Sequence, residues 1–192
     1  MDPRPAPGGA RLTAPPAEHP LIEAILAPHA TAIGADWRGY RHHVYRVAAL
    51  ASVLGPVTPE ITDKLAIAAA FHDLGIWTAG TFDYLDPSMA LAAEWLTATG
   101  RAAWTDEILA MIQDHHRIRP IRTGDPTGLV ERFRKADWVD VTMGLRTFGL
   151  RRGYWRELTA AWPTAGFHRG LVRLTLARMR EHPLSPLPML RF

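Results

Sequence analysis

Apolar residues recur every three or four positions along most of the chain, which is the spacing expected of an α-helix. Between residues 40 and 54, for example, Val44, Val47 and Leu50 fall on one helical face. We find no convincing alternation of apolar and polar residues of the kind that indicates a β-strand. The pattern therefore predicts an all-α protein.

Helix start and stop signals divide this pattern into seven or eight helices. Thr58-Pro59 is a capping residue followed by proline at the first helical position, and Gly100 is a typical C-terminal glycine. The expected helices span about 21–26, 40–54, 59–72, 86–99, 105–116, 125 to beyond 140, 152–161 and 165–182. The connection 73–86 carries Trp77, Phe82 and Tyr84, so we expect it to form the wall of a pocket.

The composition of the two ends differs from that of the middle. Residues 1–18 are rich in Pro, Gly and Ala without an apolar period, so we expect a disordered or loosely attached arm. Residues 19–183 form the expected helical bundle, a single domain, and 184–192 form a Pro-rich tail. With 47% hydrophobic residues, the 192-residue chain can bury a substantial core.

Composition also excludes several classes of function. The chain has no cysteine, which excludes disulfides and thiolate metal sites. No apolar stretch approaches the roughly 20 residues of a membrane span, and the start lacks the apolar core of a signal peptide. The formal net charge is only +3, so we do not expect nucleic-acid binding. We expect a cytoplasmic protein that does not bind membranes; a homo-oligomer stays open.

Histidine and aspartate pairs occur at four of the expected helices. His72-Asp73 ends an apolar run that begins at Leu65, where a buried carboxylate would be costly unless it is paired or binds a cation. The other three helices carry His42-His43, His115-His116, and Asp137 with Asp140. Imidazole and carboxylate groups are ligands for divalent ions, so these helices supply candidates for one metal site.

Helical spacing selects among these candidates. His43 shares a face with Val47 and Leu50, whereas His42 lies about 100° away and is expected to face solvent or support the site from behind. Asp137 lies on an apolar stripe, four residues from Phe133 and from Val141. A carboxylate on such a stripe is unusual unless it is paired or binds metal. Asp140, three residues further along, is a candidate to support a ligand.

Three segments carry a resemblance to a known family. They read His43-Val-Tyr-Arg46-Val47, Phe71-His72-Asp73-Leu-Gly75 and Arg134-Lys-Ala-Asp137. In this order and helical context they resemble the HD-domain metal-dependent phosphohydrolase superfamily, whose pattern is a His, an adjacent His-Asp and a distant Asp on a helical bundle. The resemblance covers roughly residues 38–145. It implies one divalent ion (Mn, Fe, Co, Ni, Zn or Mg) held by His43, His72, Asp73 and Asp137.

The chain also departs from the two-metal members of that superfamily. These add one His on the helix after the His-Asp and another on the next helix. His115 or His116 fits the later position, but the fourth expected helix carries no His and offers only Glu94. We therefore favour a single ion. Ile76 stands where members often have Lys, which removes one phosphate contact.

The function that follows is hydrolysis of a small phosphate ester such as a nucleotide. Asp73 would act as general base, and His115 or His116 would protonate the leaving oxygen or orient the phosphate. The remaining phosphate charge would be neutralised by Arg46, Arg117 or Lys135. Two alternatives stay open: an HD-like oxygenase or hydratase acting on a small molecule, and a non-catalytic metal-binding module that binds a ligand or partner.

Each candidate residue also has an ordinary structural explanation. His72 could be stabilised by the helix C-terminus, and Asp137 could simply pair with Arg46. His115 and His116 could be surface residues before a basic loop. Four such coincidences at four helices are improbable together, which favours the metal site. Phosphate-loop, nucleophile-elbow and His-Glu-x-x-His motifs are absent from the sequence.

Overall fold

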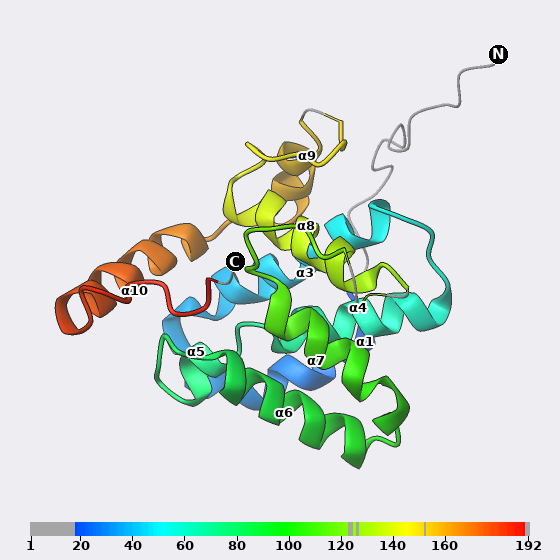
Figure 1. The fold of residues 1–192 in the computed structure, drawn as a ribbon, viewed down its shortest axis with the longest axis horizontal. Coiled ribbons are helices and arrows are strands. Elements are labelled where there is room, and N and C mark those ends of the chain that lie inside the picture. The colour runs from blue at the N-terminus through cyan, green and yellow to red at the C-terminus, as the bar shows by residue number, and fades with distance from the viewer. Residues whose placement is uncertain (1–17, 123–124, 126, 152, 191–192) are drawn as a thin grey trace.

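The computed structural model describes residues 18–122, 125, 127–151 and 153–190, and these residues form a single all-helical domain (Figure 1). The described residues contain ten α-helices, three short 3-10 helices and no strand. The α-helices are α1 (Pro20–Leu26), α2 (Ala30–Ile33), α3 (Trp37–Val53), α4 (Pro59–Phe71), α5 (Gly75–Thr78), α6 (Leu85–Ala98), α7 (Thr105–Asp114), α8 (Leu129–Val141), α9 (Tyr154–Ala161) and α10 (Phe167–Glu181). The all-α prediction is confirmed, and eight of these helices correspond to the eight expected from the sequence.

The starts of α8 and α6 differ from the sequence expectation for identifiable reasons. α8 begins at Leu129 rather than at 125, because Gly128 adopts a left-handed conformation that breaks the helix. The Asp125 carboxylate still accepts hydrogen bonds from the Val130 and Glu131 amides, at 3.3 and 2.9 Å, but from outside the helix. α6 begins at Leu85, one residue before the expected start, so Asp86 lies inside the helix. Pro126 lies outside the described residues.

The helices that carry the candidate ligands pack against one another. α3 packs against α4 and α8, and α7 packs against both α4 and α8. Every residue of α4 from Leu65 to Phe71 is buried, so this helix runs through the core. Its start is set by Thr58, whose hydroxyl accepts from the Ile61 amide at 3.2 Å. The buried end of α4 therefore delivers His72 and Asp73 to the centre of the bundle.

The C-terminal part of the chain leaves the bundle and returns to it. α10 projects to one side, and the segment that follows it folds back toward the body (Figure 1). Within this segment Met189 is buried and packs in a second hydrophobic cluster with Ile76, Phe82, Tyr84 and Leu85. The part of the expected Pro-rich tail that the structure describes is thus attached to the loop after α4.

Two further expectations concern the chain as a whole. The expected N-terminal arm lies outside the described residues except for Glu18, which forms an ion pair with Arg41 at 2.5 Å. Within the described ranges, the helices are all too short or too polar to cross a membrane.

Candidate metal centre

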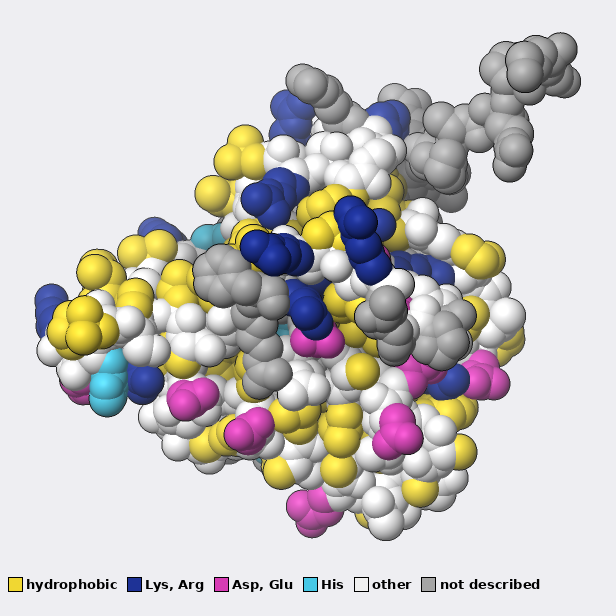
Figure 2. Space-filling model, in the orientation of Figure 1, with side chains coloured by type: hydrophobic (Ala, Val, Ile, Leu, Met, Phe, Trp, Pro, Cys, Tyr) yellow, Lys and Arg dark blue, Asp and Glu magenta, His cyan; other side chains and the backbone are white. Residues whose placement is uncertain are grey.

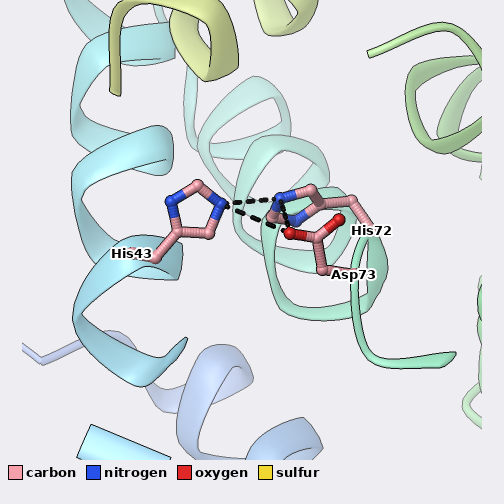
Figure 3. Close-up of side chains that lie close together, drawn as sticks. All are labelled: His43, His72 and Asp73. Atoms are coloured by element: carbon pink, nitrogen blue, oxygen red, sulfur yellow. Dashed lines mark hydrogen bonds and ion pairs between the residues drawn. The ribbon is translucent and has the colours of Figure 1, made fainter. Parts of the chain in front are cut away.

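Five buried side chains from four helices meet at one point in the bundle. His43 comes from α3, and His72 and Asp73 come from the end of α4. His115 follows the last residue of α7, and Asp137 lies on the inward face of α8. None of the five is more than 3% exposed. Figure 3 shows the rings of His43 and His72 and the carboxylate of Asp73 pointing toward one another.

The distances between these groups match the spacing of ligands around a divalent ion. The Nε2 atoms of His43 and His72 are 3.0 Å apart. From Asp137 Oδ1, the distances to those two nitrogens are 3.5 and 3.7 Å. Asp73 Oδ2 lies 3.7 and 3.4 Å from the same nitrogens. Bonds of about 2.0–2.2 Å to one ion place neighbouring ligand atoms about 3.0–3.6 Å apart, which is close to these distances. His43, His72 and Asp73 thus form a group that could hold a divalent ion, and Asp137 Oδ1 lies beside its two histidines.

The hydrogen bonds of the two histidines leave both Nε2 atoms as acceptors. His43 Nδ1 donates to Asp140 Oδ2 at 2.7 Å, and His72 Nδ1 donates to the Ala69 carbonyl at 2.7 Å. Burial lowers the pKa of His72 to about 3 and also lowers the pKa of His43, so both rings are neutral at pH 7. Two nitrogen lone pairs that face each other at 3.0 Å repel, and a cation between them removes the repulsion.

Three carboxylate oxygens of the cluster likewise have no hydrogen-bond donor. Asp73 Oδ1 and both carboxylate oxygens of Asp137 are buried without a hydrogen-bond partner. Burial raises the pKa of Asp137 well above its usual value. Unpartnered buried oxygens of this kind are costly, and a bound cation would give them a partner.

Asp73 also belongs to a second group that could hold a metal ion, together with His115 and His116. His115 Nε2 lies 3.4 Å from Asp73 Oδ1, while its Nδ1 donates to the Ile112 carbonyl at 2.6 Å. His116 Nδ1 lies 3.3 Å from Asp137 Oδ2. The structure therefore brings both histidines to the same two carboxylates, on the side away from His43.

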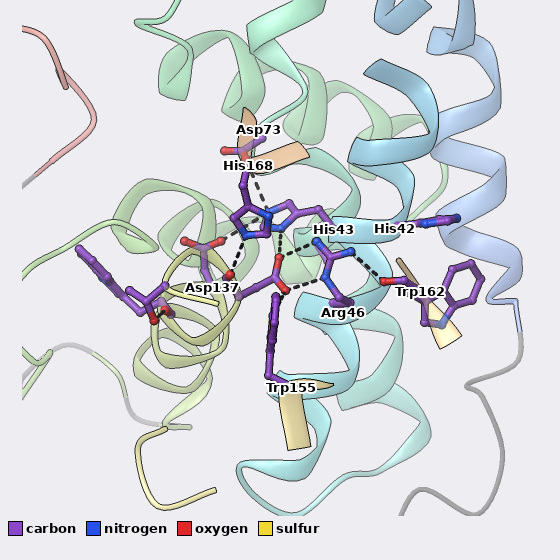
Figure 4. Close-up of polar contacts among 12 residues, drawn as sticks. His42, His43, Arg46, Asp73, Asp137, Trp155, Trp162 and His168 are labelled. Carbon is purple, nitrogen blue, oxygen red and sulfur yellow. Dashed lines mark hydrogen bonds and ion pairs between the residues drawn. The ribbon is translucent and has the colours of Figure 1, made fainter. Parts of the chain in front are cut away.

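Asp140 connects the cluster to α9 and α10 through its hydrogen bonds. Figure 4 shows its partners His43, Arg46, Trp155 and His168 gathered in one place. Its carboxylate accepts from His43, from Arg46 at 2.6 and 2.8 Å, and from Trp155 Nε1 at 2.8 Å. Its backbone carbonyl is 2.9 Å from His168 Nε2. These hydrogen bonds hold the pKa of Asp140 below its usual value despite burial, so it is an anion that orients His43.

The expectation that Arg46 contacts substrate is not supported by its position. The side chain is fully buried, and its guanidinium donates to Asp140 and to the Trp162 carbonyl at 3.0 Å. Its partner is Asp140, so the alternative in which Arg46 simply pairs with Asp137 is wrong. His42 is buried as well, and its Nδ1 lies 2.7 Å from the Pro163 carbonyl. Both residues connect α3 to the segment that follows α9.

Three other charged candidates lie outside the cluster. Lys135 forms an ion pair with Glu131 at 3.5 Å and lines a separate cavity of about 470 Å³ with Ile61 and Phe148. The Arg117 side chain is 39% exposed and lies 3.9 Å from Asp114. Glu94 is exposed on α6.

Two tyrosines reach the cluster, and only one of them was noted in the sequence. Tyr84, expected as a pocket wall, has its hydroxyl 3.4 Å from His115 Nε2. Tyr40 is fully buried, and its hydroxyl donates to the Ala70 carbonyl at 2.9 Å. Tyr40 lies three residues before His43, on the same helical face, which is a spacing that could have identified it.

Comparison of the chain with protein-family models, curated proteins and solved structures gives no match. The chemistry of the site is therefore inferred from its own residues. His43, His72 and Asp73 form a buried group that could hold a metal ion, and Asp73 Oδ1 and both carboxylate oxygens of Asp137 lie buried beside it without a hydrogen-bond donor.

Proposed function

We propose that the protein is a metal-dependent phosphohydrolase of the HD-domain type that acts on a small phosphate ester such as a nucleotide. The observation that carries the proposal is the pair of inward-facing Nε2 atoms of His43 and His72 beside the unpartnered carboxylates of Asp73 and Asp137. This donor set contains only nitrogen and oxygen, which suits Mn, Fe, Co, Ni, Zn or Mg.

In this proposal His43, His72, Asp73 and Asp137 hold one divalent ion. When bound, such an ion lowers the pKa of a water molecule and offsets the charge of a phosphoryl group. Asp73 has an oxygen, Oδ1, that no donor occupies, and this atom takes the proton of the attacking water. His115 or His116, beside the same carboxylates, gives a proton to the leaving oxygen or orients the phosphate.

Charge on the surface supports an anionic substrate. His116 is the most exposed of the clustered side chains, at 14%, so the approach from solvent is on its side. The rings of His116 and Trp138 meet edge-on. The Arg146 guanidinium lies over the Trp138 ring, 4.8 Å from its centroid. Figure 2 shows Lys and Arg gathered over α8 and acidic side chains over α6 and α7. Such a field attracts a phosphate ester toward His116.

The test compares Asp73→Ala with Asp83→Ala, an exposed aspartate in the loop that follows. Purified protein would be loaded with each candidate ion and assayed on p-nitrophenyl phosphate and on nucleoside monophosphates. We expect hydrolysis that requires metal and is abolished by chelator, with less than about 1% of it left in Asp73→Ala and an unchanged rate in Asp83→Ala. An equal rate in wild type and Asp73→Ala would refute the proposed mechanism.

The group formed by Asp73, His115 and His116 favours a second candidate function. If this group holds a second ion, Asp73 is shared by two metals, and oxidation of a small molecule by a pair of irons becomes the better reading. Two equivalents of iron in the purified protein, with no phosphatase activity, would support it. Bound metal without turnover on either class of substrate would instead support a non-catalytic binding module.

A further inference from the structure

The hydroxyl of Tyr84 points into the cluster, where His115 and Asp73 are its neighbours. Its distance to His115 Nε2, 3.4 Å, is long for an O–H donor, whose usual range ends near 3.0 Å. Tyr40 is a useful contrast, since its hydroxyl donates to the Ala70 carbonyl at 2.9 Å. Both side chains are almost completely buried. One buried phenol therefore donates to a backbone carbonyl, and the other faces the side chains of the cluster.

The backbone of Tyr84 is held directly against the segment that follows Asp73. A Cβ atom on Gly75 would lie only 2.5 Å from the Tyr84 carbonyl oxygen and 2.9 Å from Ser88 Oγ. Real Cβ atoms do not approach this closely, so the contact requires glycine. The Gly75 amide also donates to Ser88 Oγ at 2.9 Å. These contacts fix the position of Tyr84 relative to Asp73, two residues before Gly75.

The ring of Tyr84 is held by the second hydrophobic cluster. Ile76, Phe82 and Leu85 surround it, and Met189 packs there from the segment after α10. Leu174 of α10 packs against the same cluster. The C-terminal part of the chain therefore closes the outer side of the Tyr84 pocket, and a ring packed in this way has little freedom to turn its hydroxyl away.

We propose that the Tyr84 hydroxyl donates a hydrogen bond to a phosphoryl oxygen of the substrate at the cluster. This inference rests on the proposed function. An ordinary phenol has a pKa of about 10, so the Tyr84 hydroxyl carries its proton at neutral pH. A donor held in place before the substrate arrives stabilises developing negative charge without reorganisation, and loss of one such donor typically lowers kcat by about 100-fold or more.

The first experiment compares Tyr84→Phe with Tyr40→Phe in the metal-loaded protein. Both variants remove one buried hydroxyl beside the same cluster and leave the ring in place. We expect Tyr84→Phe to lower kcat by about 100-fold, with KM within about threefold and unchanged metal content. Tyr40→Phe should keep kcat within about threefold. An equal loss in the two variants, or loss of metal from Tyr84→Phe, would show a structural role and overturn the proposal.

The second experiment separates this inference from the proposed function. Binding of inorganic phosphate to the metal-loaded proteins would be measured by titration calorimetry, which needs no turnover. We expect Tyr84→Phe to weaken phosphate binding by about tenfold or more, and Tyr40→Phe to leave it unchanged. If the wild type hydrolyses no ester but its phosphate binding depends on Tyr84, the proposed hydrolase function is refuted and the role of Tyr84 as a hydrogen-bond donor is supported. Equal affinities in wild type and Tyr84→Phe, or no phosphate binding at all, would overturn it.

Discussion

His43 and His72 point their Nε2 atoms at each other across 3.0 Å, although each ring already donates from its Nδ1 atom to another acceptor. With both rings neutral, neither Nε2 carries a hydrogen to share. The lone pairs of the two Nε2 atoms and of the nearby Asp137 carboxylate therefore face one another. This arrangement is unfavourable in a buried site unless a cation binds there.

Asp140 accepts the hydrogen bond from His43 Nδ1 and so sets the direction of His43 Nε2. The variant Asp140→Asn tests how much this bond contributes to metal affinity. The Asp140 carboxylate orients His43 and, through its negative charge, makes His43 Nε2 a better metal ligand. The amide of the variant lacks this charge. We expect metal affinity to fall by about 10- to 100-fold, measured by competition with a chelating dye. The exposed aspartate of α7, as Asp106→Asn, is the control and should bind metal like the wild type. Equal affinity in all three proteins would mean that Asp140 does not tune the site.

Arg46 neutralises Asp140 in the core, so its removal should destabilise the fold. Arg46→Met leaves a fully buried carboxylate without its main cationic partner. We expect the free energy of unfolding in urea to fall by about 3–5 kcal/mol. The double variant Arg46→Met with Asp140→Leu removes both charges and should recover much of that loss. If the double variant is as unstable as the single one, the buried ion pair is not the cause.

The low pKa of His72 predicts how the stability of the metal-free protein depends on pH. In the unfolded chain its pKa is about 6.5, and in the folded protein it is about 3. Between these values the unfolded state binds a proton that the folded state does not. The contribution of His72 is therefore complete above about pH 6.5 and declines as the pH falls toward 3.

Chelator-treated protein unfolded by urea at a series of pH values provides the measurement. The free energy of unfolding should decrease steadily from pH 6.5 downward, and His72→Gln should show a shallower decrease over the same range. Parallel curves for the two proteins would contradict the assignment of a buried, neutral His72.

Much of the candidate site was predictable from the sequence because it lies on regular helices. His43, Asp137 and Asp140 each follow from helical spacing relative to buried neighbours such as Val47 and Phe133. His72 follows from the end of a continuous apolar run. These residues face inward wherever the helices pack, so their orientation does not depend on how distant segments are arranged.

The partners of Asp140 were not predictable in the same way. Trp155 and His168 come from α9 and α10, and their contacts depend on how those helices return to α8. Nothing in the local sequence distinguishes them from other aromatic residues. Arg46 was expected to contact substrate because a helical pattern shows only that a residue faces inward. The pattern does not show that the partner of Arg46 is the Asp140 carboxylate.

Gly75 gives a prediction about the loop that carries Tyr84. Its replacement by Ala puts a methyl group 2.5 Å from the Tyr84 carbonyl, so the loop must shift. We expect Gly75→Ala to lower the free energy of unfolding by about 1–3 kcal/mol. It should also lower kcat, although every polar side chain of the site is still present. Gly170→Ala, whose added Cβ would have only Asp36 Oδ1 within 4 Å, at 3.9 Å, is the control for an added methyl group. Wild-type stability and turnover in Gly75→Ala would mean that the contact is unimportant.

The metal content of the purified protein tests the central claim most directly. Elemental analysis of protein loaded with a candidate ion and then desalted should find one tightly bound equivalent in the wild type. Asp137→Ala and His43→Ala should retain little or none, because each removes a ligand from a buried four-residue set. If the wild type binds no ion, or if both variants bind as much as the wild type does, the cluster of His43, His72, Asp73 and Asp137 is not a metal site.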